Sequence, residues 1–184
     1  MPRVHHRKAR KDYPDNGIVK GDMYYTCRRK TGPWSSVTLR SLTPFKASQL
    51  TGSAFKSAWF GAEEGWDASG KSEQDITDVA EAIRAAGEEA GESLDNMPES
   101  LQQGDTGQML EERASQCEDT AGDLDSLASE YEELEEPVEP LGDLEEDWEN
   151  ESAAEDYETE MDTFKSEVER IRGDVGDIFG NMPE

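Results

Sequence analysis

Charge is divided very unevenly along this chain of 184 residues, and the division limits the core that each part can build. Residues 1–60 contain twelve Lys or Arg and three Asp, a net charge of +9, whereas residues 61–184 contain six Lys or Arg and forty-one Asp or Glu, a net charge of −35. Hydrophobic residues make up 33% of the chain and charged residues 34%, which leaves little apolar surface for a large compact core. The sequence therefore predicts an α+β protein, with a small basic N-terminal β-hairpin module (residues 1–60) followed by an acidic, elongated helical hairpin or coiled-coil region.

The basic part has the pattern of a β-hairpin. Residues 23–29 and 35–41 are rich in Tyr, Thr, Val and Leu, and Gly32-Pro33 between them is a typical turn pair. Strand side chains alternate between faces, so cationic and aromatic groups should occur on both faces. We expect the aromatic residues mainly to supply the core of a small domain; they are Tyr24, Tyr25, Trp34, Phe45, Phe55, Trp59 and Phe60.

Five cations within nine positions at the N-terminus, without apolar periodicity, predict a flexible arm that contacts a polyanion. Lys and Arg neutralise phosphates, and Tyr or Trp can stack on exposed bases. The candidate nucleic-acid-binding residues, all within residues 1–46, are Arg3, Arg7, Lys8, Arg10, Lys11, Arg28, Arg29, Lys30 and Arg40. The alternative partner is an acidic protein surface, including the chain's own acidic tail, which would then mask the arm.

Residues 65–72, GWDASGKS, match the phosphate-loop pattern G-x-x-x-x-G-K-[ST] letter by letter. A true phosphate loop follows a buried strand, but the preceding FGAEEG is unsuited to one, and Glu63, Glu64 and Asp67 would repel a nucleotide. We interpret residues 61–72 as an acidic linker that ends at a helix N-cap. Ser72 would be the cap, and Asp75 its capping-box partner.

From residue 73 onward, apolar residues recur at the spacing of amphipathic helices. A helical hairpin is expected over residues 73–136, with a break at Pro98, and residues 137–184 should form an acidic linker and a C-terminal amphipathic helix. The first stripe consists of Ile76, Val79, Ile83, Ala86 and Ala90, and the second runs from Leu110 through Cys117 to Leu134. We expect Cys117 to act as a small buried hydrophobe. The helices could also pair between chains in a homo-oligomer.

The tetrapeptide NMPE occurs at residues 96–99 and 181–184, each time after an apolar helical stretch. This repetition suggests that two helices end in the same kind of turn.

Residues 129–160 contain sixteen Asp or Glu in thirty-two positions and no Lys or Arg. Such a segment is either a solvated acidic face, as in a salt-adapted protein, or a polyanion surface that imitates nucleic acid and binds a basic host protein. The candidate protein-contact residues are Leu144, Trp148, Tyr157, Phe164, Val168 and Ile171.

The sequence offers no arrangement of residues for catalysis, a metal or a cofactor. Cys27 and Cys117 are ninety positions apart, and both histidines, His5 and His6, lie in the N-terminal arm. We therefore expect a protein that is not an enzyme and has no cofactor. No apolar run reaches the ~20 residues of a membrane span, so we expect no membrane partner and a cytoplasmic location, in the host cell if the gene is viral, with the virion as a further possibility.

Three stretches of the sequence resemble a family of uncharacterised proteins from tailed phages and prophages. They are ARKDYPDNGIVKGDMYY (residues 9–25) with the basic hairpin after it, KASQLTGSAF (residues 46–55), and SLDNMPESLQQGDTGQMLEERASQCE (residues 93–118). The resemblance covers about residues 3–56 and 90–120 and implies no particular activity. Members are expected to continue the Tyr pair with further aromatic residues, whereas this chain has Thr26 and Cys27, which argues against base stacking along that strand.

Overall fold

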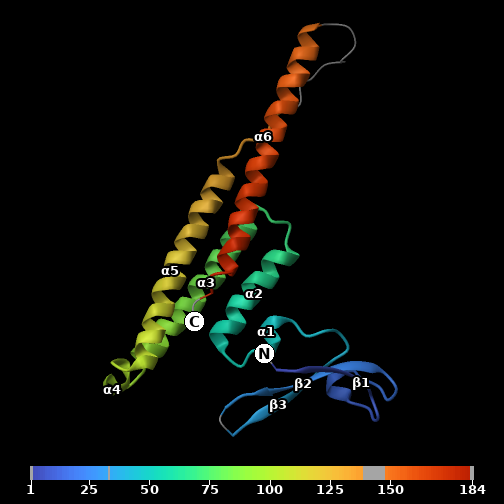
Figure 1. Cartoon of the computed structure of the whole chain (residues 1–184), viewed down its shortest axis with the longest axis vertical. Helices are drawn as coiled ribbons and strands as arrows, with labels where there is room; N and C mark the ends of the chain where they lie inside the picture. Colours follow the sequence, from blue (N-terminus) through green and yellow to red (C-terminus); the bar gives the residue numbers. More distant parts are fainter. Residues whose placement is uncertain (1, 33, 139–147, 183–184) are drawn as a thin grey trace.

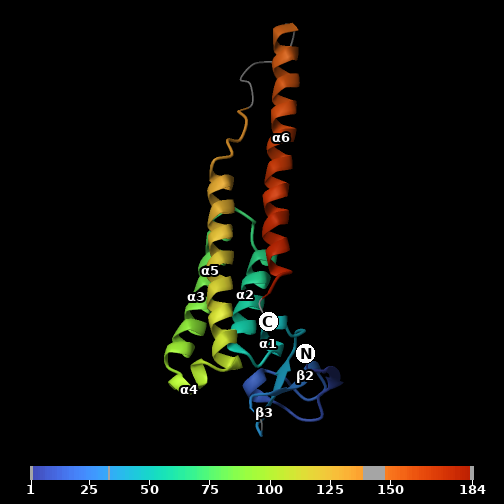
Figure 2. The same ribbon diagram turned by 60° about the vertical axis from the view of Figure 1, so that its left-hand side comes forward.

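The chain is an α+β protein in which a small antiparallel sheet lies at one end of an elongated set of helices (Figure 1). The computed structural model describes residues 2–32, 34–138 and 148–182. The helices extend away from the sheet in both views (Figures 1 and 2). The expected fold class is thereby confirmed at the level of an N-terminal sheet followed by helices.

The sheet has three strands in the order β1-β2-β3, namely β1 (Val4–Lys8), β2 (Met23–Lys30) and β3 (Ser36–Ser41). The predicted hairpin corresponds to β2 and β3. The expectation of a flexible arm is corrected, because Val4–Lys8 pairs with β2 as an edge strand and the His6 ring stacks on Tyr25 at 4.5 Å between centroids. An edge strand gains its stability from backbone pairing, so it needs no apolar alternation that a sequence could reveal.

The connection between β1 and β2 folds back on the sheet. Ala9, Ile18 and Tyr24 are buried together there, with Tyr13 packed against them. A 3₁₀ helix, η1 (Pro14–Asn16), turns the chain, and Gly17 and Gly21 have φ values of 66° and 107°, which suit glycine. The conspicuous pattern at residues 9–25 therefore encodes a closed connection with its own small core.

Six α-helices follow the sheet in the described residues: α1 (Ala47–Leu50), α2 (Ala54–Ala68), α3 (Glu73–Asp95), α4 (Glu99–Gln102), α5 (Asp105–Glu132) and α6 (Trp148–Phe179). Residues 61–68, expected to be part of an acidic linker, continue α2, because Trp59, Ala62 and Trp66 are buried along one side of this helix. The helix cap was predicted correctly: the Ser72 hydroxyl accepts from the Asp75 amide, and the Asp75 carboxylate accepts from the Ser72 amide.

Helices α2, α3, α5 and α6 share one narrow hydrophobic core. The first predicted stripe, from Ile76 to Ala90, is buried throughout. Cys117 is fully buried as expected, and burial raises the pKa of its thiol to about 11. The described part of the C-terminal helix adds Ile171, Val175 and Phe179 to the core.

Both NMPE segments follow the end of a long helix, as predicted. The side-chain amide of Asn96 donates to the Glu92 carbonyl oxygen at 2.8 Å, and that of Asn181 donates to the Asp177 carbonyl oxygen at 3.3 Å. In each case the asparagine closes the last turn of its helix.

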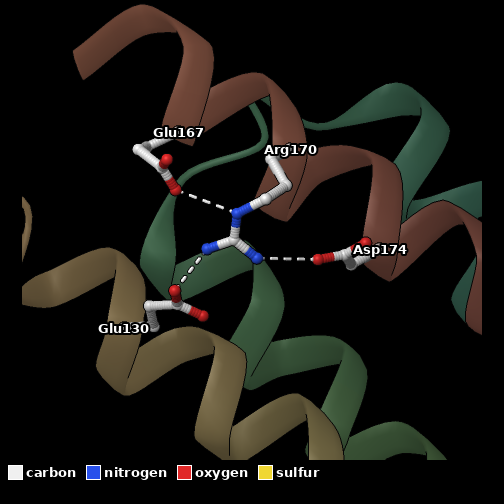
Figure 3. A network of polar contacts seen from close by, with 4 residues as sticks. All are labelled: Glu130, Glu167, Arg170 and Asp174. Carbon is white, nitrogen blue, oxygen red and sulfur yellow. Dashed lines mark hydrogen bonds and ion pairs between the residues drawn. The ribbon is translucent and has the colours of Figure 1, made fainter. Parts of the chain in front are cut away.

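Arginine side chains join the acidic helices. Arg170 of α6 donates to Glu130 of α5 and, within its own helix, to Glu167 at 2.9 Å and Asp174 at 3.0 Å (Figure 3). Arg84 of α3 likewise donates to Asp125 of α5 at 2.6 Å. These arginines offset part of the repulsion between neighbouring carboxylates.

We expect opposite effects on stability from two Gly→Ala changes in α3. A Cβ at Gly87 would lie 2.7 Å from the Cys117 Cβ, so Gly87→Ala should force α3 and α5 apart and destabilise the fold by about 1–3 kcal/mol. No atom lies within 4 Å of a Cβ at Gly91, so Gly91→Ala should stabilise the helix by about 0.5–1 kcal/mol. Urea denaturation followed by circular dichroism measures both changes, and a stabilising Gly87→Ala would contradict the close packing of α3 on α5.

Candidate functional site

One face of the sheet collects cationic side chains from all three strands. The strand register aligns Arg7 with Tyr24, Arg28 with Thr38, and Lys30 with Ser36. His5, Thr26 and Arg40 form a further row across the three strands. Alternation of side chains along a strand places all of these residues on the same face. We call this surface the basic face; its cations are Arg7, Arg28, Lys30 and Arg40, and His5 lies among them.

The charge of the basic face is not neutralised by carboxylates. Among the described residues, none of these five side chains forms an ion pair. Arg28 donates through Nε to the Ser36 hydroxyl at 2.7 Å, which leaves its charge intact. The contrast with Arg84 and Arg170, which are held by carboxylates, indicates a surface that is open to an anion.

The β1–β2 connection covers one end of this face. The Arg40 guanidinium lies 4.5 Å from the centroid of the Tyr13 ring, and the Lys11 ammonium lies 5.5 Å from the same ring. A pocket with a volume of about 670 Å³ lies there, and its lining includes Arg7, Lys8, Arg10, Tyr13 and Tyr24. Cations therefore continue from the sheet onto the connection.

The opposite face of the sheet holds two of the predicted cations in other roles. Arg29 donates through Nη1 to the carbonyl oxygens of Gln49 at 3.0 Å and Thr51 at 2.9 Å, so it fastens β2 to the α1–α2 turn. Lys8 lies on this face opposite Met23. The predicted set is thus divided: Arg7, Arg28, Lys30 and Arg40 share the basic face, whereas Arg3, Arg10 and Lys11 lie outside the strands.

A concave site lies where the sheet meets the helices, and we call it the junction pocket. Its volume is about 630 Å³, and it is lined by Pro2, Arg28, Arg29, Lys30, Leu50, Thr51, Gly52, Lys56, Phe60 and Met182. Sequence reasoning missed Lys56, Phe60 and Met182 as site residues, because only the fold brings α2 and the end of the chain next to β2.

The aromatic residues of the basic part divide between core and surface. Phe55 and Trp59 are buried in the helical core and Tyr24 in the sheet core, as expected. Trp34 is 99% exposed, so the expectation that it is a core residue is wrong. It follows β2 in the turn to β3.

The described parts of the acidic segment lie away from the sheet, toward the opposite end of the molecule (Figure 1). The described parts of residues 129–160 are the end of α5 and the beginning of α6, both far from β1–β3 in the two views (Figures 1 and 2). The described parts of residues 129–160 therefore do not cover the basic face within one chain. α6 runs from the far end back toward the sheet, so masking by the rest of the tail stays a prediction.

The predicted protein-contact residues fall into different surroundings. Val168 and Ile171 are 7% and 0% exposed and pack inside the chain's own core. Tyr157 and Phe164 are half-buried on α6, and Phe164 lines a groove of about 500 Å³ with Leu134, Pro137 and Val138. Trp148 is the first residue of α6, and the structure describes only its backbone. Leu144 lies outside the described residues.

The phosphate-loop pattern has no phosphate-loop structure. Its first four residues belong to α2, its serine caps α3, and helix rather than strand precedes it. In the described ranges, no cluster of His, Cys, Asp and Glu has the geometry to hold a metal, and no helix is long and apolar enough to cross a membrane. Comparisons with protein-family models, with curated proteins and with solved structures gave no match.

Proposed function

We propose that this protein is a non-enzymatic, phage-type adaptor whose basic face binds the phosphate backbone of a nucleic acid while its acidic helices bind protein or a second copy of the chain. The observation that supports the proposal is the basic face itself, where cations from three strands share one surface without ion pairs. Because carboxylates neutralise none of these charges in the described structure, phosphates are the natural partners.

The distribution of charge over the molecule favours a single orientation on a polyanion. The cationic residues 1–60 lie at the end with the sheet, and the helices with most of the 41 acidic residues of 61–184 extend away from it (Figure 1). A nucleic acid would attract the sheet and repel the helices. The helices would then project from the nucleic acid, where they are available to a protein.

The first test is binding of a labelled nucleic acid by the full chain in a salt series, measured by fluorescence anisotropy. Each phosphate contact contributes about −0.9 to the slope of log K against log salt for duplex DNA. We expect binding at low ionic strength with a slope of about −3 to −4, which corresponds to the four Lys and Arg side chains of the basic face. Absence of binding at the lowest salt concentration would refute the proposal.

A second candidate function rests on the groove at the acidic end. Its lining combines apolar residues such as Leu134, Val138 and Phe164 with four glutamates, Glu135, Glu136, Glu160 and Glu167. This combination favours a basic, amphipathic protein segment, as in an inhibitor that imitates nucleic acid. Capture of a basic DNA-binding protein that survives nuclease treatment, and is lost in Phe164→Glu, would support this alternative.

A further inference from the structure

We propose that the junction pocket holds one unstacked nucleotide, so that the nucleic acid bound by the basic face is single-stranded. The inference rests on the proposed function and adds the class of nucleic acid. Three features of the pocket support the inference: its position next to the basic face, the chemistry of its lining, and a wall that is already formed without a ligand.

The pocket is continuous with the basic face. Arg28 and Lys30 of the basic face and Arg29 of the opposite face all line the junction pocket, which therefore lies at the edge of β2. β1 pairs with residues 23–27 of β2 and not with residues 28–30, so a strand whose phosphates contact Arg28 and Lys30 can reach the pocket around this edge. Lys56 of α2 is a further cation of the lining.

The lining suits a base together with its phosphate. Pro2, Leu50, Phe60 and Met182 offer apolar surface, and Phe60 offers an aromatic ring for stacking. The charged residues of the lining are all cationic: Arg28, Arg29, Lys30 and Lys56. A base stacked on an aromatic side chain, with its phosphate held by nearby cations, is the usual mode of single-strand recognition.

The fold constructs the pocket wall without a ligand. Arg29 fixes the α1–α2 turn through the Gln49 and Thr51 carbonyl oxygens. The turn approaches β2 so closely that a Cβ at Gly52 would lie 2.7 Å from the Lys30 carbonyl oxygen. A preformed wall reduces the ordering that binding requires.

A duplex cannot use this site, because its bases are paired and stacked inside the helix. The pocket should therefore discriminate between a single strand with bases and the same backbone without them. A 12-nucleotide oligothymidylate, an abasic strand of equal length and a 12-base-pair duplex are suitable probes for the full chain.

We expect the full chain to bind oligothymidylate about tenfold more tightly than the abasic strand, as base stacking on an aromatic side chain predicts. Phe60→Leu should abolish this preference while it leaves abasic binding within about twofold. Phe45→Leu, the same change at a half-buried phenylalanine outside the pocket, should keep the preference. Thermal denaturation of each variant shows whether the fold is retained.

Lys56 offers a second test that leaves the apolar lining intact. Lys56→Gln should weaken single-strand binding by about three- to tenfold and lower the salt slope by ~0.7. Lys71→Gln, in the turn after α2, should change neither quantity.

Equal affinity for oligothymidylate and the abasic strand, or a preference that persists in Phe60→Leu, would overturn the nucleotide pocket while the proposed function stands. Tighter binding of the duplex than of oligothymidylate would also overturn it. If none of the three probes binds at the lowest salt concentration, the proposed function fails, and the pocket inference fails with it.

Discussion

Replacing Trp59 by alanine is expected to destabilise the protein by about 3–5 kcal/mol, the usual cost of truncating a buried tryptophan. Trp59 is 1% exposed in the helical core. Its ring lies 6.2 Å from Phe55 on the same helix and edge-on to Phe179 of α6 at 6.4 Å between centroids. Loss of the ring would leave a cavity between α2 and α6, and the few neighbouring side chains of this narrow core could not fill it.

Trp34→Ala provides a matched control, because it is the same chemical change at a residue that is 99% exposed. Its effect on the free energy of unfolding should stay within about 0.5 kcal/mol. Urea denaturation followed by circular dichroism at 222 nm, the helix band, compares the two variants. Equal losses of stability in Trp59→Ala and Trp34→Ala would contradict the assignment of Trp59 to the core.

Neutralising Arg3 and Arg7 is expected to lower nucleic-acid affinity about tenfold or more at low salt, because two phosphate contacts are lost. Arg7 belongs to the basic face and Arg3 directly precedes β1, where we expect it to extend the same interface; both side chains are exposed, and neither lines the junction pocket. For duplex DNA the salt slope of Arg3→Gln/Arg7→Gln should be less steep by about 1.8, at ~0.9 per contact. Anisotropy titrations at several salt concentrations measure both quantities.

The control for this experiment removes the same charge from the helical part. Lys71→Gln/Lys165→Gln also loses two cations, one in the α2–α3 turn and one on α6. If net charge alone governed binding, both double variants would lose affinity equally. The proposed interface instead requires a loss confined to Arg3→Gln/Arg7→Gln, and equal losses would speak against it.

Helices with an apolar periodicity were predictable from the sequence, and so were their ends. The stripe from Ile76 to Ala90, the Ser72 cap and the two Asn turns at Asn96 and Asn181 all occur as expected. These features depend on local spacing and on side chains that bond to their own helix. Local interactions of this kind can be predicted from the sequence alone.

Strand β1 and the beginning of the expected linker were not predictable in the same way. β1 is held by pairing to a strand about twenty residues away. Its side chains are mostly exposed and cationic, so its sequence lacks the apolar alternation that is typical of a strand. The composition of residues 61–68 resembles a linker, although Gly61, Gly65 and Asp67 are exposed, Glu64 accepts hydrogen bonds from Ser48 of α1, and Ala62 and Trp66 are buried on one side of the helix. Both cases depend on tertiary contacts that override local preference.

The candidate site was predictable in its charge but not in its shape. The sequence identified the cations of residues 1–46, but the register decided that Arg7, Arg28, Lys30 and Arg40 share a face. The hydrogen bonds of Arg29 to the Gln49 and Thr51 carbonyl oxygens show that this cation instead holds β2 against the α1–α2 turn. The junction pocket requires Met182 to line the same pocket as residues of β2, an arrangement across almost the whole chain that no local pattern encodes.

Lysine footprinting of the full chain tests the central claim most directly. Six of the eight lysines lie in residues 1–60, and the other two are Lys71 and Lys165. With a bound nucleic acid, acetylation followed by mass spectrometry should show protection of Lys11, Lys30 and Lys56, and unchanged reaction of Lys71 and Lys165. Protection spread equally over all lysines, or none at Lys30 while the nucleic acid is bound, would contradict a nucleic-acid interface on the basic face.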